Sequence, residues 1–145
     1  MRSIVVASIF VAGCVEPEVG SPSREACTGE DSDPDTEIDY ARDIDGAIIH
    51  GGANCQLCHT PGFGTPIGLS LGGLDLSSAE ALRRGGIESG TDIVVPGDPC
   101  NSILVQKIGA SPPFGARMPL DGPPYLDRAQ VQVIIDWIAE GAHAE

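Results

Sequence analysis

The feature that most constrains this chain is the pentapeptide Cys55-Gln56-Leu57-Cys58-His59, which has the spacing C-x-x-C-H. Two thiols three residues apart on one helical turn reach the two vinyl groups of a haem, and the histidine that follows then points at the iron. We therefore predict one covalent haem c, attached through Cys55 and Cys58, with His59 as an axial ligand of the iron.

Other uses of this spacing fit the sequence less well. A redox-active C-x-x-C is expected near a βαβ pattern, and no strand alternation surrounds this one. A structural zinc site needs four ligands, usually from two paired motifs, and the chain has no second C-x-x-C. A disulfide between Cys55 and Cys58 would leave His59 unexplained.

Composition narrows the fold class and the partners. The chain has 145 residues, of which 19 are Gly and 12 are Pro, and this favours short helices joined by long loops. The aromatic residues are three Phe, two Tyr and one Trp, so a haem would supply much of the missing core volume. A net charge of -13 excludes binding driven by nucleic-acid phosphates, and it predicts a redox partner with a basic patch.

The amino terminus predicts export and a lipid anchor. A basic start is followed by an apolar run over residues 3–12, too short to span a bilayer but typical of a signal peptide. The run ends in an aliphatic residue, two small residues and a cysteine, Val11-Ala12-Gly13-Cys14. This ending resembles the lipobox of bacterial lipoproteins, which implies cleavage after residues 1–13 and lipidation of Cys14. Val15 in the next position favours a periplasmic protein anchored to the outer membrane over one anchored to the inner membrane. The alternative for this amino terminus is a plain signal peptide that is cleaved elsewhere.

An acidic segment follows the predicted lipid anchor. Eleven of the 21 acidic residues lie between Glu16 and Asp45. We expect residues 14–35 to form a flexible tether and residues 36–145 to form one domain.

Helix signals begin directly after this tether. Apolar residues recur at helical spacing at Ile38, Ala41, Ile44 and Ile48. The run stops at Gly51 and Gly52. Thr36 or Asp43 could cap the start of this helix.

Three further helices have signals at their ends. Ser77 and Glu80 fit a capping box for a helix over residues 79–84, which Gly85-Gly86 would close. Asp98-Pro99 predicts the start of another helix. Its inward residues would be Ile103, Leu104 and Ile108, and it would stop at Gly109. The last helix has the fullest set of signals: a capping box, a hydrophobic staple, an apolar stripe with a Trp at its edge, and a glycine stop. Its residues are Asp127, Gln130, Leu126, Val131, Ile134, Ile135, Ile138, Trp137 and Gly141.

Several motifs after residue 40 occur together in one family. They are Cys55-Gln56-Leu57-Cys58-His59, Gly73-Leu74-Asp75-Leu76-Ser77-Ser78, Val95-Pro96-Gly97-Asp98-Pro99, Arg117-Met118-Pro119 and Asp136-Trp137-Ile138-Ala139-Glu140-Gly141-Ala142. In this order the chain resembles the small bacterial c-type cytochrome domains of the planctomycete and myxobacterial type. The resemblance implies an all-α cytochrome c fold with one covalent haem, His and Met axial ligation, and electron transfer instead of enzymatic catalysis.

Met118 is the leading candidate for the sixth iron ligand. It is the only methionine left once the signal peptide is removed, and prolines flank its loop on both sides. A thioether is a soft ligand that favours Fe(II). His50 is the chief rival, and His143, near the end of the chain, is a weaker one.

The identity of the sixth ligand separates two functions. With Met118 on the iron, the chain is a mono-haem electron carrier. With the distal site open, it is a haem-based ligand binder or sensor. A weak peroxidase ranks lower because no distal His and Arg pair is evident, and a disulfide-bonded lipoprotein without haem is the remaining alternative.

Two cysteines remain after lipidation and haem attachment are assigned. Because the compartment is oxidising, we expect Cys27 and Cys100 to form a disulfide, which would contribute about 4 kcal/mol in the chain-entropy model. Two unpaired thiols or an intermolecular bond are the alternatives.

Overall fold

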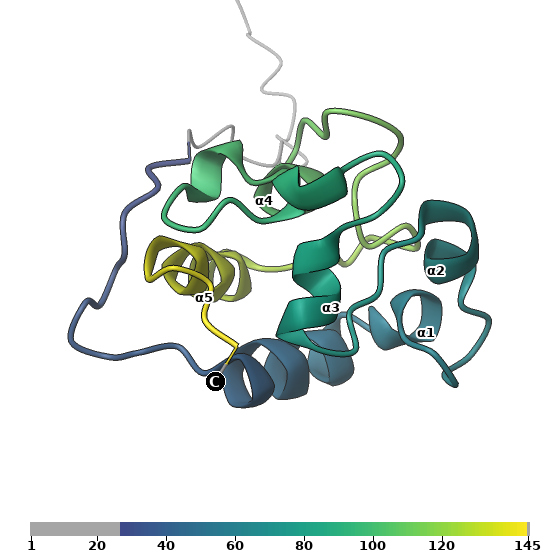
Figure 1. Ribbon diagram of the computed structural model, residues 1–145, viewed down its shortest axis with the longest axis horizontal. Coiled ribbons are helices and arrows are strands. Elements are labelled where there is room, and N and C mark those ends of the chain that lie inside the picture. Colours follow the sequence, from purple (N-terminus) through teal and green to yellow (C-terminus); the bar gives the residue numbers. More distant parts are fainter. Residues whose placement is uncertain (1–26, 145) are drawn as a thin grey trace, which may run out of the picture.

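Helices are the only regular secondary structure in the described part of the protein. A computed structural model describes residues 27–144 and has helices and loops but no strand over that range (Figure 1). The elements are η1 (Tyr40–Gly52), α1 (Gln56–His59), α2 (Ile67–Gly72), α3 (Ala79–Arg84), η2 (Gly90–Ile93), η3 (Pro99–Asn101), α4 (Ile103–Ile108) and α5 (Arg128–Ala139). The predicted all-α fold class with short helices is confirmed.

The predicted membrane-targeting features fall outside the described range. The signal peptide, Cys14 and the first part of the tether precede residue 27. Over residues 27–144, no helix is both long and apolar enough to cross a bilayer. Lipidation at Cys14 therefore stays a prediction.

The core lies where η1 and α5 pack together. Trp137 is completely buried, its ring centroid lies 5.3 Å from that of Tyr40, and its Nε1 donates to the carbonyl of His143 at 2.9 Å. The buried apolar residues around this pair include Ile44, Ile48, Ile49, Leu82, Ile93, Val105, Ile108, Ile134, Ile135 and Ile138. We expected Trp137 at the edge of the α5 stripe. It is nevertheless completely buried, because η1 covers the face of α5 that carries it.

The first helix begins at a different cap from the ones we expected. Asp39 is the N-cap, and its carboxylate accepts from the backbone N–H of Arg42 at 2.6 Å. Thr36 lies outside the helix and Asp43 lies within its first turn, where its carboxylate accepts from the N–H of Asp39 at 3.0 Å. The helix is of the π type.

The third α-helix spans the predicted residues but has a different cap. Ser78 is the N-cap of α3, and its Oγ accepts from Ala81 N at 3.1 Å. The predicted cap, Ser77, lies one residue earlier, where its N–H donates to Asp75 at 2.9 Å. Gly85 closes the helix with a φ of 75°, a conformation that suits glycine.

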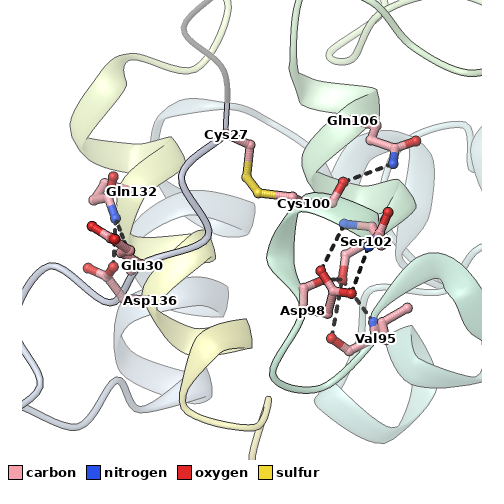
Figure 2. Close-up of a disulfide and its surroundings, with 10 residues drawn as sticks. Cys27, Glu30, Val95, Asp98, Cys100, Ser102, Gln106, Gln132 and Asp136 are labelled. Carbon is pink, nitrogen blue, oxygen red and sulfur yellow. Dashed lines mark hydrogen bonds between the residues drawn. A yellow bond between two sulfur atoms is a disulfide. The ribbon is translucent and has the colours of Figure 1, made fainter.

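The helix predicted from Pro99 is divided into two pieces. Asp98 caps η3 as predicted, but the helix breaks at Ser102 before α4 begins and ends at Gly109. The fully buried Ser102 accepts from Val95 N at 2.8 Å and donates to the carbonyl of Asp98 at 2.9 Å (Figure 2). These bonds hold an extended residue between the two helical pieces.

The last helix is the one that the sequence predicts best. Asp127 and Gln130 form the reciprocal capping box at its start, with bonds of 2.9 and 3.0 Å. Gly141 follows its end with a φ of 109°. Both predictions are confirmed.

Residues 27–39, which we call the strap, run along α5. A disulfide joins Cys27 to Cys100 with a Cα–Cα distance of 5.5 Å (Figure 2). Ser32 donates to both carboxylate oxygens of Asp136 at 2.9 and 2.6 Å, and the N–H of Ile38 donates to Glu140 at 2.8 Å. Within the tether predicted over residues 14–35, Cys27 and Ser32 are bonded to the domain.

Candidate haem site

The two thiols of the motif lie at and within α1. His59 N donates to the carbonyl of Cys55 at 3.0 Å, which closes the turn that brings Cys55, Cys58 and His59 together. Both cysteines are free and partly buried. Burial raises the pKa of Cys55 to about 11, and the negative charges of Asp121 and Cys58 add to the rise. Cys55 is therefore a protonated thiol at neutral pH.

The His59 side chain is fixed by the segment that follows α2. Its Nδ1 lies 3.0 Å from the carbonyl oxygen of Leu74. Because a carbonyl only accepts, Nδ1 carries a proton, and Nε2 is the nitrogen that remains for a metal. The main chain is held as well, since Leu76 N donates to the carbonyl of His59 at 2.9 Å.

The same segment connects the site to the core. The hydroxyl of Tyr40 donates to the carbonyl of Leu76 at 3.3 Å. Tyr40 is buried in the η1–α5 core, and burial raises the pKa of its phenol, which therefore remains a donor. The Gly73–Ser78 motif thus positions His59 through its backbone carbonyls and amides.

Gly68 in α2 makes room for the imidazole of His59. A Cβ at this position would lie 2.5 Å from Nε2 and 2.7 Å from Nδ1 of His59, closer than real Cβ atoms approach other atoms. Our sequence analysis missed Gly68. We predicted no helix over Ile67–Gly72, so the close approach of Gly68 to His59 had no local signal.

Met118 lies in the loop after α4. Met118 is partly buried against the core, and its N–H donates to the carbonyl of Lys107 at 2.8 Å. Asp121, three residues later, lies near enough to Cys55 to raise the pKa of its thiol. Cys55 and Met118 are both partly buried residues packed against the same hydrophobic core.

The two rival histidines have other partners. His50 Nδ1 lies 2.8 Å from Asp45 Oδ1, and its ring meets the edge of Phe63 at a centroid distance of 5.4 Å. His143 is exposed next to Gly141, beyond the end of α5. Neither arrangement favours these residues over Met118.

The residues of this region fit a haem. Two free thiols, an imidazole oriented through Nδ1 and a thioether are the groups that a c-type site uses. None of the residues of α1 and α2 is buried, and large apolar side chains of this end are exposed: Leu57, Phe63, Ile67, Leu71, Leu120 and Tyr125. Exposed apolar side chains in the helices and loops that carry these groups suit a large, flat and apolar ligand.

The helical fold and the C-x-x-C-H motif are similar to those of a c-type cytochrome domain. Residues 55–121 match the family described as Planctomycete cytochrome C, and the match includes the C-x-x-C-H motif and Met118. It covers just under half of the chain and ends before α5. No curated protein and no solved structure matches the chain. The predicted resemblance is confirmed, and the family implies a covalent haem c.

Proposed function

We propose that this protein is a mono-haem electron carrier in which Cys55 and Cys58 hold the haem, and His59 and Met118 ligate the iron. One observation carries the proposal most: the Leu74 carbonyl fixes the His59 tautomer beside two free thiols. When bound, the haem supplies a one-electron couple between Fe(II) and Fe(III).

The chain's own residues would adjust that couple. The hydrogen bond from His59 Nδ1 to Leu74 orients the imidazole and increases its basicity. The thioether of Met118 favours Fe(II) and raises the reduction potential. The protein makes no bond to a substrate in this role, so we propose a carrier and not an enzyme.

The excess of acidic residues supports a partner with a basic patch. At physiological salt, exposed charges are screened beyond about 8 Å, so electron transfer to such a partner should slow as salt is added. Removing residues 16–26, which precede the strap, tests where the steering charge lies. If the salt dependence disappears with this segment, the haem end of the molecule does not steer the partner.

We also propose that Cys14 anchors the protein to the periplasmic face of the outer membrane. The support is the lipobox-like sequence before it. Labelling with a radioactive fatty acid should mark the wild type and not Cys14→Ala. Label retained in Cys14→Ala would contradict the anchor without affecting the haem proposal.

A visible spectrum tests the carrier proposal. Protein made with a c-type maturation system should retain one haem per chain after extraction with acid acetone. The oxidised form should show the weak thioether–iron(III) band at the red edge of the visible spectrum, and the reduced form should bind carbon monoxide slowly. Met118→Ala should lose the band and bind carbon monoxide readily, whereas His50→Ala should behave as the wild type. Rapid, stoichiometric binding by the reduced wild type would favour the sensor function instead.

A further inference from the structure

Lys107 is the only lysine in the sequence, and it lies in the last turn of α4. Its ammonium group donates to the backbone carbonyls of Phe114 at 2.8 Å and Ala116 at 2.6 Å. It also lies 4.8 Å from the centroid of the Phe114 ring. Two carbonyls of one loop therefore converge on a single cation.

The backbone of Lys107 holds the same loop at a second point. Its carbonyl accepts from the N–H of Met118 at 2.8 Å. Side chain and main chain of one residue thus bind three positions within residues 114–118. The adjacent Arg117 reinforces the contact, since its Nε donates to the carbonyl of Ile108 at 2.9 Å.

The charge pattern makes this use of the only lysine informative. The chain has a net charge of -13, so carboxylates are abundant. Within residues 27–144, the Lys107 amine nevertheless has no carboxylate oxygen within 4.0 Å. Hydrogen bonds from a charged donor are stronger than those from a neutral donor. Here the charged donor binds the loop that carries Met118.

We propose that Lys107 is a positioning residue that fastens residues 114–118 to α4, and so keeps Met118 in place at the sixth position of the iron. The second half of this statement rests on the proposed function, whereas the first half concerns the loop alone. Small ligands would then reach the iron only when the loop detaches.

The experiment compares Lys107→Met and Lys107→Arg with wild-type holoprotein. Lys107→Met removes the charged donors but keeps a long side chain and the backbone carbonyl. We expect the amides of residues 114–118 to exchange with deuterium about tenfold faster in Lys107→Met, because two hydrogen bonds are lost. The amides of α5 should be unchanged, which separates loop release from general destabilisation. Lys107→Arg, which retains charged donors, should restore most of the protection.

Carbon monoxide binding reports on the iron side of the proposal. In reduced Lys107→Met, association should be about tenfold faster than in the wild type, in proportion to loop opening. Arg84→Gln is the matched control, because it removes one exposed positive charge at the end of α3.

Equal exchange of residues 114–118 in Lys107→Met and wild type would overturn the fastening role. Faster exchange without faster carbon monoxide binding would overturn the link to the sixth ligand. If the wild type itself lacks the thioether band, the proposed function fails, and the exchange measurement still decides whether Lys107 fastens the loop.

Guanidination with O-methylisourea gives an independent check, because it modifies only lysine side chains. The product has a single modified side chain, which keeps its charge and its donors. It should behave like Lys107→Arg. Loop exchange as fast as in Lys107→Met would contradict the proposal.

Discussion

The two ends of the molecule are held together in different ways. At one end, the strap, η1 and α5 surround a buried core, which we call the packed side. At the other end of the long axis, α1, α2 and the loop over residues 109–126 form the site side (Figure 1). Trp137 and Ile138 on the packed side are fully buried, while no residue of α1 or α2 is buried.

This difference separates stability from positioning. The packed side has apolar burial, an aromatic pair and a disulfide, which are large contributions to the free energy of unfolding. The site side is fixed by hydrogen bonds that a few side chains donate to backbone carbonyls, such as His59 to Leu74 and Lys107 to Phe114. Such bonds contribute little net stability but determine orientation. Substitutions on the two sides should therefore have distinguishable effects.

The largest expected effect is on the packed side, at Trp137. Trp137→Ala should lower the free energy of unfolding by about 3–5 kcal/mol, because it leaves a cavity beside Tyr40 and an unpaired His143 carbonyl. Urea denaturation followed by circular dichroism measures the change. Trp137→Phe keeps a ring and should cost less. A loss below about 1 kcal/mol in Trp137→Ala would mean that this core does not dominate stability.

The disulfide is expected to have the next largest effect. The double variant Cys27→Ser with Cys100→Ser should lose about 2–4 kcal/mol, because the bond closes a loop between residues 73 apart in sequence. Urea denaturation followed by Trp137 fluorescence is the measurement. The haem spectrum should be unchanged, since the strap lies along α5. A changed spectrum would show that the two sides are coupled.

The same difference between the two sides explains which of their features the sequence predicted. The capping box of α5 depends on neighbouring residues, so local spacing was sufficient to predict it. The complete burial of Trp137 depends on how η1 packs against α5, and no local pattern contains that information. The motif of Cys55, Cys58 and His59 was evident because its chemistry requires adjacent residues.

The supports of that motif were less evident. Leu74 acts through its backbone carbonyl, which any residue has, so its identity gives no signal. Lys107 has the sequence signal of an ordinary cation in the last turn of a helix. Its contact with the loop depends on the tertiary fold, which places the carbonyl of Ala116 beside its amine. The caps at Asp39 and Ser78 were missed because several capping residues lie within a few positions, and tertiary packing selects among them.

A smaller effect on stability, with a large effect on the site, is expected at Gly68. Gly68→Ala should change the free energy of unfolding by less than about 1 kcal/mol, because better helix propensity offsets part of the clash. The added Cβ should displace the His59 ring from the Leu74 carbonyl. Gly72→Ala, in the same helix, is the control, because its Cβ would meet nothing within 4 Å. Nuclear magnetic resonance of the His59 ring proton should separate the two variants, and identical signals would refute the role of Gly68.

The smallest expected effect is a pH dependence on the packed side, at Glu140. Burial raises the pKa of this carboxyl, and the charges of Asp31, Asp136 and Glu37 raise it further, against the hydrogen bond from Ile38 N. A raised pKa in the folded state means that folding favours the protonated form. The stabilising contribution is therefore complete below the ordinary glutamate pKa of about 4.3, and it is lost as the pH rises through the raised value.

Glu140→Gln should thus increase the melting temperature at pH 7, because the amide oxygen still accepts from Ile38 without the charge. The gain should stay under about 1 kcal/mol, since solvent partly screens a carboxyl that is only partly buried. It should shrink as the pH falls toward about 4, where Glu140 is protonated in the wild type too. Lowering the net negative charge stabilises such an acidic chain in a general way, so Glu88→Gln, an exposed site outside the strap, is the control. An equal gain in both variants at pH 7 would assign the effect to net charge, and the strap would then have no pH-sensitive fastening at Glu140.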